Sequence, residues 1–170
     1  MSEGLYRLNA LSESEAEAEL LKCCGSTLWA RRVAGARPFD SPQGLLAAAD
    51  SVWWALDRED WLEAFSRHPK IGERESARAQ APEAKRWSEQ EQAGTNDADQ
   101  ETKREFREGN REYEEKFGHI YIVCATGKSA GEMLHGLRER MGNDNETELG
   151  RAAEEQRKIT ELRLRKLLET

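Results

Sequence analysis

The apolar residues of this chain recur at helical spacing along most of its length, which is the pattern of helices with one buried face. Ser12 and Glu15 form a capping-box pattern, and Ala16, Leu20 and Cys24 follow at the same helical spacing. These features predict that the first helix begins after Ser12.

Serine and proline residues predict where the next helices begin and end. Ser26 can cap a second, short helix, and Ser41-Pro42 can start a third, because proline is accepted in the first turn of a helix. The aromatic run from Trp61 to Phe65 predicts another short helix. It should end at His68-Pro69, because the residue before a proline is disfavoured in the α region.

The middle of the chain is strongly polar. Residues 73–86 are alanine-rich and charged with few large apolar groups, so we expect a mobile connection or a frayed helix there. Residues 87–116 predict one long helix with a mostly solvated surface. Further on, Ser129 and Glu132 form a second capping box, and the last helix is predicted from about Asn145 to the C-terminus.

Residues 117–125 break the helical pattern with a β-branched, apolar run that favours a strand. No second convincing strand is available to pair with it, so we expect an extended segment between helices. Its backbone N–H and C=O groups must then find other partners, and could bind a ligand. The predicted fold is all-α: a single compact multi-helix domain over residues 1–170, with one extended apolar segment near 117–125.

Composition narrows the classes of function. The net charge of −7 and the pI near 5.2 argue against a nucleic-acid-binding protein, which needs a basic surface. Neither a signal peptide nor a membrane span is evident, and the cysteines Cys23, Cys24 and Cys124 are a poor basis for a disulfide framework. We therefore expect a cytoplasmic protein. Cysteine and histidine residues lack paired ligand spacing, so no structural metal is expected.

His68 is the first candidate for chemistry. It stands directly before Pro69, on a backbone that the proline constrains, and histidine titrates near neutral pH. A catalytic role suits this position. A capping or packing role at a helix end is the alternative.

A second candidate is the stretch from Ser88 to Gly94, which combines carboxylates and amides. Ser88 and Glu91 have the spacing of a capping box, so a purely structural role is one interpretation. If Glu91 and Gln92 instead face a pocket, they offer hydrogen-bond acceptors and donors to a polar heterocycle.

Arg163 is the third candidate. It lies between Leu162 and Leu164 on the last predicted helix, so its guanidinium could be held at a pocket wall and bind a carboxylate or carbonyl. A long arginine can also extend past an apolar surface to reach water.

Taken together, these motifs resemble the OHCU decarboxylase family. OHCU is 2-oxo-4-hydroxy-4-carboxy-5-ureidoimidazoline, an unstable product of urate oxidation, which the family converts to (S)-allantoin. The resemblance covers nearly the whole chain and rests on motifs in the family's order and rough spacing: Asn9-Ala10-Leu11, Cys23-Cys24-Gly25-Ser26, Arg37-Pro38-Phe39, Asp60 to Phe65, His68 to Gly72, Ser88 with Glu91 to Gly94, Phe117 to Gly127, and Ile159 to Leu164.

The resemblance implies an all-helical homodimer that works on a small molecule without a metal or organic cofactor. It assigns catalysis to His68 and Glu91. It assigns substrate binding to the polar side chains of Ser88, Gln92 and Arg163. Pro69 and Phe117 would shape the pocket, and the backbone of Ile120, Ile122 and Cys124 would also contact the substrate. Glu89 is an alternative to Glu91, and Arg157 and Arg165 are alternatives to Arg163.

Two other classes of function remain open from the sequence. A helical interaction module would account for the charged helices, with His68-Pro69 as only a helix stop, although apolar anchors at regular helical spacing are not evident. A different small-molecule enzyme, such as a hydrolase or an isomerase, could use the same histidine and glutamate.

Overall fold

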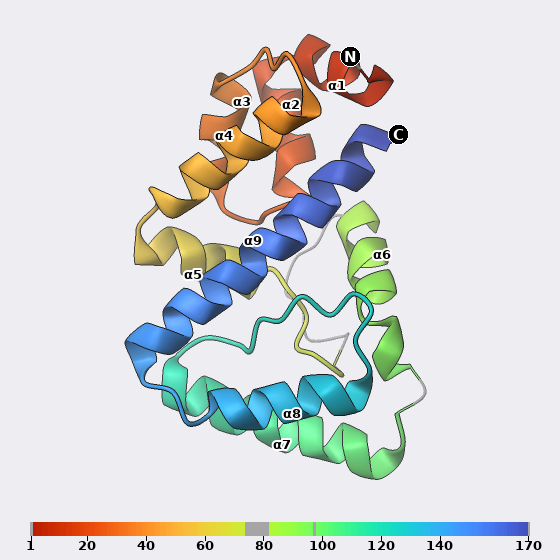
Figure 1. The fold of residues 1–170 in the computed structure, drawn as a ribbon, viewed down its shortest axis with the longest axis vertical. Coiled ribbons are helices and arrows are strands. Elements are labelled where there is room, and N and C mark those ends of the chain that lie inside the picture. The colour runs from red at the N-terminus through yellow and green to blue at the C-terminus, as the bar shows by residue number, and fades with distance from the viewer. Residues whose placement is uncertain (1, 74–81, 97, 170) are drawn as a thin grey trace. The chain divides into compact units, whose positions relative to one another are not determined.

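The computed structural model describes residues 2–73, 82–96 and 98–169. Over these ranges the chain is helical and forms no strand, which confirms the predicted all-α class (Figure 1). The elements are α1 (Glu3–Ala10), α2 (Glu13–Leu21), α3 (Thr27–Gly35), α4 (Pro42–Trp54), α5 (Arg58–Ser66), α6 (Pro82–Glu91), the short 3-10 helix η2 (Ala93–Thr95), α7 (Gln100–Phe117), α8 (Ala130–Arg140) and α9 (Asn145–Glu169).

The chain divides into two compact units. The first unit comprises residues 1–64 and 157–170, and the second comprises residues 65–156. The division falls inside α9, so this helix contributes residues to both units. The prediction of a single domain over residues 1–170 stays a prediction.

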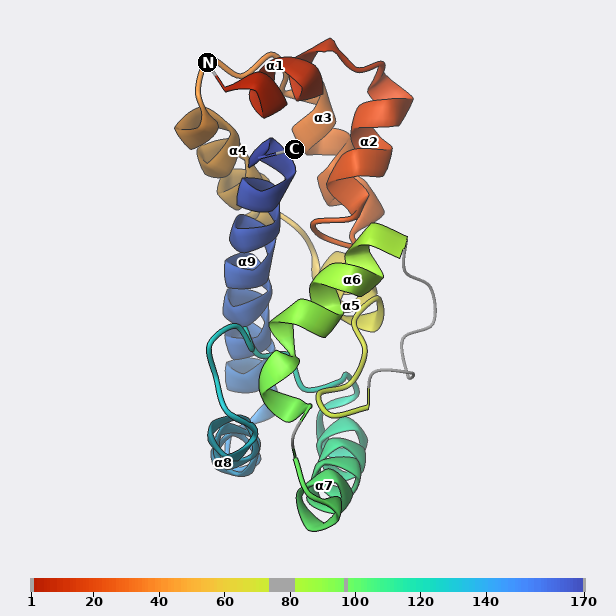
Figure 2. The ribbon, with the colours of Figure 1, turned by 90° about the vertical axis from the view of Figure 1, so that its right-hand side faces the viewer.

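In the first unit, α2 packs on α3 and α3 packs on α4 (Figure 2). The three serines predicted to cap these helices do so: Ser12, Ser26 and Ser41 each accept a hydrogen bond from the backbone N–H three residues further on. The helix α1 was not predicted. It lies so close to the end of α9 that a Cβ atom at Gly4 would stand 2.1 Å from the carbonyl oxygen of Leu168, so glycine is required there.

In the second unit, α7 and α8 lie side by side and enclose an apolar core (Figure 1). The core also takes in alternate residues of the segment that follows α7. Its members are Ile71, Phe106, Tyr113, Phe117, Tyr121, Val123, Ala125, Met133, Leu134 and Leu137.

The polar stretch over residues 87–116 is not one helix, which corrects the prediction. α6 ends at Glu91, and α7 begins only after Asp99, whose side chain accepts from the Thr102 N–H. The break lies where η2 meets another backbone segment, since a Cβ at Gly94 would stand 2.1 Å from the Lys128 carbonyl oxygen. Residues 82–86, expected to be mobile or frayed, form the start of α6, and residues 74–81 lie outside the described residues.

The segment 119–125 belongs to no helix, as predicted, but Phe117, which was expected to belong to it, is the last residue of α7. Side chains bond to the backbone of the segment in place of a neighbouring strand. The Ile122 carbonyl accepts from Arg140 Nη1 at 2.6 Å, and the Cys124 N–H donates to Glu155 Oε1 at 3.2 Å. These bonds satisfy polar groups that would otherwise be buried without partners.

Arg140 forms a buried ion pair with Glu148. The side chains are 8% and 0% exposed, and Arg140 Nε donates to both carboxylate oxygens. The guanidinium also lies over the Tyr121 ring, 4.7 Å from its centroid. Burial acts to lower the pKa of Arg140, but the hydrogen bond to Glu148 and the nearby negative charge raise it overall, so the group stays charged.

Replacing Arg140 by Met should lower the free energy of unfolding by about 3–5 kcal/mol, because the buried Glu148 carboxylate is left without its cation. Urea unfolding measures this loss. The matched control is Arg138→Met, whose guanidinium is exposed and pairs with Glu105, with an expected change of about 0–1 kcal/mol. Equal losses in the two variants would contradict the assignment of Arg140 as a buried structural cation.

Candidate active site

His68 lies just past the end of α5, as the sequence predicts. α5 ends at Ser66, and the His68 N–H closes one further turn by donating to the Phe65 carbonyl at 3.2 Å. Pro69 is buried and has no N–H with which to continue the helix. The His68 ring is half-buried, so it combines a fixed backbone with partial access to solvent.

A tight turn follows His68 and is held from two helices. The Glu73 N–H donates to the Lys70 carbonyl at 2.9 Å, and Gly72 has the positive φ of 79° that the third position of a type II turn requires. Asn110 Nδ2 of α7 donates to the Ile71 carbonyl at 2.9 Å. Next to α6, Gln92 Oε1 accepts from the Gly72 N–H at 3.2 Å. The turn is therefore fixed at consecutive residues.

The His68 ring itself is bonded to α9. His68 Nε2 lies 2.6 Å from Oε1 of Gln156, whose side chain is fully buried. The imidazole is thus attached at a ring nitrogen as well as through its backbone.

One face of α6 carries the polar candidates. Ser88 and Glu91 are 3% and 9% exposed, Gln92 just beyond the helix end is 4% exposed, and their spacing of three and four residues places them on the same side. Glu89 is exposed. Ser88 sits in the interior of α6, not at its start, so the capping-box interpretation of Ser88 and Glu91 is wrong.

Cys124 lies close to two acidic side chains, Glu155 of α9 and Glu91 of α6. Burial raises the pKa of its thiol, and the carboxylates of Glu155 and then Glu91 raise it further, while Lys128 acts in the opposite direction. Lys128 Nζ is 3.8 Å from Glu155 Oε1. The structure thus brings Glu91 of α6 and the extended segment into one electrostatic neighbourhood.

The other candidates of the extended segment have mainly structural contacts. The Ile120 carbonyl lies 3.0 Å from Nδ1 of His119, and the Ile122 carbonyl is taken by Arg140. Phe117 belongs to the apolar core, with its ring centroid 4.6 Å from that of Tyr113. Phe117 supports the segment by packing.

Arg163 lies in the first unit. Its side chain is 3% exposed, and Nη1 donates to the Lys22 carbonyl at 3.2 Å. Burial raises the pKa of nearby Cys24 to about 12, and the Arg163 charge is one of the effects that lower it. By contrast, Arg165 is exposed and pairs with Glu161, and Arg157 pairs with Asp50 and Glu161. Of the three arginines, Arg163 is the buried one.

Asn110, Glu155 and Gln156, which bond to the turn, the segment and the His68 ring, were not predicted from the sequence. Each is a polar residue on a helix, which usually indicates a solvated position. The signal that could have found the two on α9 is their register: Gln156 lies four residues after the buried Ala152, and Glu155 lies three residues after it, on the same helix face.

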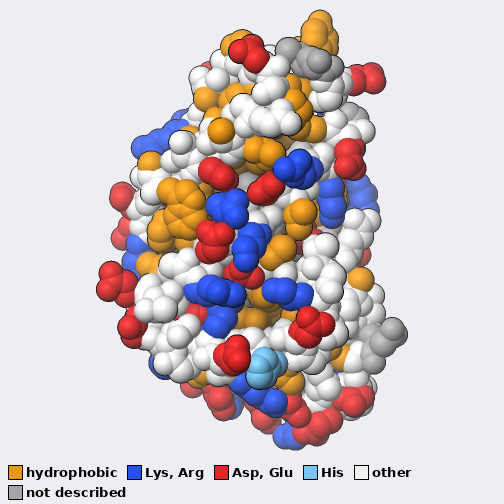
Figure 3. Space-filling model, viewed as in Figure 1, with side chains coloured by type: hydrophobic (Ala, Val, Ile, Leu, Met, Phe, Trp, Pro, Cys, Tyr) orange, Lys and Arg blue, Asp and Glu red, His pale blue; other side chains and the backbone are white. Residues whose placement is uncertain are grey.

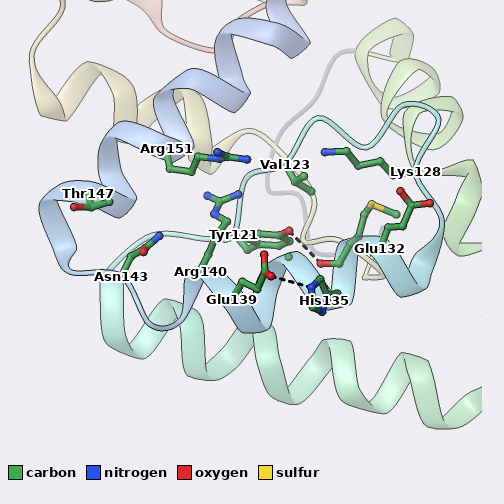
Figure 4. Close-up of a pocket in the computed structure, with 12 residues that line it drawn as sticks. Tyr121, Val123, Lys128, Glu132, His135, Glu139, Arg140, Asn143, Thr147 and Arg151 are labelled. Atoms are coloured by element: carbon green, nitrogen blue, oxygen red, sulfur yellow. Dashed lines mark hydrogen bonds and ion pairs between the residues drawn. The ribbon is translucent and has the colours of Figure 1, made fainter.

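A cavity of about 560 Å³ lies elsewhere in the second unit (Figure 4). Tyr121 and Val123 line it, together with charged residues of α8 and the start of α9, and Figure 3 shows basic side chains over this part of the surface. None of the candidate residues from the sequence lines this cavity. Successive side chains of an extended chain point to opposite sides. The cavity, which Tyr121 and Val123 line, therefore lies on the side of the segment opposite the side chains of Ile120, Ile122 and Cys124.

Within the described ranges, no cluster of three histidine, cysteine, aspartate or glutamate side chains is arranged to hold a metal ion. In the same ranges, no helix is both long enough and apolar enough to cross a membrane. The turn after His68 is bonded to Gln92, which follows the buried Glu91 directly in the sequence. An imidazole, a carboxylate and an amide are groups that can exchange a proton and hold a polar ring.

Comparison with known proteins gives a consistent set of matches. Residues 9–165 match the sequence profile of OHCU decarboxylase. The uric acid degradation bifunctional protein TTL of Arabidopsis thaliana is 39% identical over 151 residues, which are 89% of this chain and 47% of TTL. The 2-oxo-4-hydroxy-4-carboxy-5-ureidoimidazoline decarboxylase of Amia calva is 34% identical over 102 residues, covering 60% of this chain and 58% of that protein.

A solved structure is also similar. The crystal structure of an OHCU decarboxylase in the presence of (S)-allantoin superposes with a TM-score of 0.77 at 37% identity, over 89% of this chain and 98% of that one. The chain spans less than half the length of the bifunctional uric acid degradation proteins that it matches.

Replacing Gly72 by Ala should destabilise the second unit by about 1–2 kcal/mol, because a left-handed backbone disfavours any Cβ. The new Cβ would also lie 3.1 Å from the Phe106 ring. Urea unfolding measures the effect. In the control Gly150→Ala, a Cβ on α9 meets nothing within 4 Å, and we expect a gain of about 0.5–1 kcal/mol from helix propensity. A Gly72→Ala protein as stable as the Gly150→Ala protein would show that the turn is not held as described.

Proposed function

Because the chain belongs to the OHCU decarboxylase family, we propose that it decarboxylates OHCU to (S)-allantoin in urate degradation, with His68 and Glu91 as the catalytic pair. The observation that carries this proposal is the arrangement in the second unit. His68 stands on a turn that Gln92 and Asn110 hold, and Glu91 is buried on the same face of α6 as Ser88.

The reaction requires proton transfer and stabilisation of the negative charge that develops on the ring. When the carbon–carbon bond to the carboxylate breaks, carbon dioxide leaves and the electron pair stays on the ring, giving an enolate-like intermediate. Hydrogen-bond donors aimed at that charge lower the barrier. A proton then adds to the ring carbon from one face, which yields one enantiomer.

His68 exchanges a proton with the substrate hydroxyl or with the developing intermediate, a task suited to an imidazole that titrates near neutral pH. Glu91 assists as the buried carboxylate of the site. The burial of Glu91 and the exposure of Glu89 support the choice between these two acids.

Gln92 and Ser88 hold the polar ring. Gln92 Oε1 accepts a hydrogen bond from the Gly72 N–H. Its Nε2 forms no hydrogen bond with any residue that the structure describes, so this amide N–H group can donate to a substrate carbonyl. In the segment, the Ile122 carbonyl and the Cys124 N–H already have partners. The Ile120 and Ile122 N–H groups and the Cys124 carbonyl are therefore the backbone contacts that we propose.

Pro69 and Phe117 shape the site, Pro69 by fixing the His68 backbone and Phe117 by packing beneath the segment. Arg163 is proposed as the guanidinium that anchors the substrate. Its burial supports this choice over Arg157 and Arg165, because a carboxylate or carbonyl binds a desolvated arginine more strongly. The homodimer that the family resemblance implies stays a prediction.

Replacing His68 by Asn should lower kcat/KM for OHCU by about 10²–10⁴-fold, because the group that exchanges the proton is lost. The assay generates OHCU from urate with the two upstream enzymes and follows the circular dichroism of (S)-allantoin. Wild-type protein should give a rapid enantiomeric signal, and His68→Asn should give slow formation of racemic product.

His135→Asn is the matched control, since this histidine is exposed and pairs only with Glu139 in the described structure. It should keep wild-type activity. Decarboxylation by His68→Asn at the wild-type rate would remove His68 from the mechanism. Racemic product with the wild-type protein would remove the decarboxylase function and favour the interaction module or another small-molecule enzyme.

A further inference from the structure

The cavity of about 560 Å³ beside Tyr121 and Val123 has no part in the proposed reaction, because none of the candidate catalytic or substrate-binding residues lines it. Its volume lies in the usual range of small-molecule pockets. All the residues that line it belong to the second unit. The cavity is therefore available to a second ligand.

The floor of the cavity is apolar and held in place. Tyr121, Val123 and Met133 are buried there, and the Tyr121 hydroxyl donates to the Met133 carbonyl at 3.1 Å. A Cβ atom at Gly136 would stand 2.9 Å from the Tyr121 hydroxyl oxygen, so glycine lets the ring lie against α8. A ligand therefore meets a preformed surface.

Three cationic side chains reach the cavity from different parts of the second unit. Lys128 comes from the turn before α8, Arg140 from α8 and Arg151 from α9, and Figure 4 shows all three extending toward the cavity. Like charges that converge on one space repel one another, and an anion bound between them removes that cost. The arrangement favours a negatively charged ligand.

Arg140 is a fixed part of the wall. Its Nε donates to Glu148, its Nη1 donates to the Ile122 carbonyl, and its guanidinium lies over the Tyr121 ring. Nη2 is buried and has no hydrogen-bond partner among the described residues. One nitrogen of this cation is thus left without an acceptor in the described structure, which is rare for a buried polar group.

Arg151 is the cation that is open to a ligand. It is exposed, and it forms no ion pair or hydrogen bond with any residue that the structure describes. Lys128 differs, because its Nζ lies 3.8 Å from Glu155 Oε1 and its charge is partly balanced.

Two acids also line the cavity, and each is already engaged. Glu132 Oε1 accepts from the Ser129 N–H at the start of α8, and Glu139 Oε1 lies 2.9 Å from His135 Nε2. Neither acid pairs with Arg151 in the part of the chain that the structure describes. The lining therefore leaves the Arg151 charge without a paired carboxylate.

We propose that this cavity is a binding site for a small oxyanion, the carboxylate or phosphate group of a small molecule, with Arg151 as the main contact. A planar guanidinium donates two parallel N–H groups, which match the oxygens of either group. Lys128 and Arg140 add positive charge, and the amide of Asn143, in the turn after α8, can donate a further hydrogen bond. The apolar floor accepts a short carbon chain. This site does not depend on the proposed function.

The first test is a titration of the full chain followed by two-dimensional ¹H–¹⁵N NMR, at low ionic strength because salt screens the attraction. Succinate and inorganic phosphate are the two probes, and uncharged succinamide is the control for succinate. One or both anions should shift the amide signals of Lys128, Asn143 and Arg151 saturably, whereas succinamide should not. The anion with the lower Kd identifies the ligand group as carboxylate or phosphate.

The second test is the same titration of Arg151→Met. Loss of a charge-assisted hydrogen bond should raise the Kd by about tenfold or more. The matched control is Arg111→Met, which removes an exposed arginine of α7 that likewise has no partner in the described structure and does not line the cavity. It should leave the Kd unchanged. Both arginines are exposed, so both variants should fold as the wild-type protein does, which urea unfolding verifies.

Saturable binding that Arg151→Met leaves unchanged would overturn the proposal, because the anion would then bind elsewhere. An equal rise of the Kd in both variants would indicate general electrostatic attraction and would also overturn it, as would failure of both anions to saturate at millimolar concentration. Turnover of OHCU is a separate measurement. A failed decarboxylation assay with intact anion binding would remove the proposed function and leave this site in place.

Discussion

Three polar side chains of α9, each fully buried, form hydrogen bonds or ion pairs within the second unit. Glu148 pairs with Arg140, which holds the Ile122 carbonyl; Glu155 accepts from the Cys124 N–H; and Gln156 meets His68. A buried backbone group left without a hydrogen bond costs about 1–3 kcal/mol. The apolar segment, which pairs with no strand in the described structure, is therefore held by Arg140 of α8, itself paired with Glu148 of α9, and by Glu155 of α9.

The same arrangement connects packing to the proposed chemistry. The side chains of Tyr121 and Val123 point into the core between α7 and α8, so alternation turns Ile122 and Cys124 to the other side. The carboxylates of Glu155 and Glu91 are near enough to Cys124 to raise the pKa of its thiol. His68 is fixed by helix residues at its ring and along the turn that follows it, which gives the site the rigidity that proton transfer at a fixed distance requires.

The sequence predicts the features whose causes are local. The caps at Ser12 and Ser129, the stop at His68-Pro69 and the unpaired segment after Phe117 depend on a few neighbouring residues and agree with the structure, whereas the cap considered at Ser88 does not. The break between α6 and α7 does not, since it depends on the close approach of Gly94 to the Lys128 backbone. Segments far apart in the chain meet there, and a local pattern cannot report such a contact.

The residues that hold the site were missed for a related reason. Glutamate, glutamine and asparagine on a charged helix look like solvated positions, and only the tertiary fold turns Asn110, Glu155 and Gln156 inward. The catalytic candidates were accessible from the sequence because a family resemblance supplied their roles. Glu91 was preferred to Glu89 because Gln92-Ala93-Gly94 follows it, and the structure adds that Glu91 is buried and Glu89 exposed.

The dependence of the extended segment on α9 is tested most directly by native-state hydrogen exchange at the Cys124 amide. This N–H donates to Glu155 Oε1, so it should be protected in the wild-type protein. In Glu155→Leu, protection should fall at Cys124 while the amides of α7 keep theirs. A Cys124 amide that exchanges in the wild-type protein as fast as an unprotected one, or that stays protected in Glu155→Leu, would contradict the account.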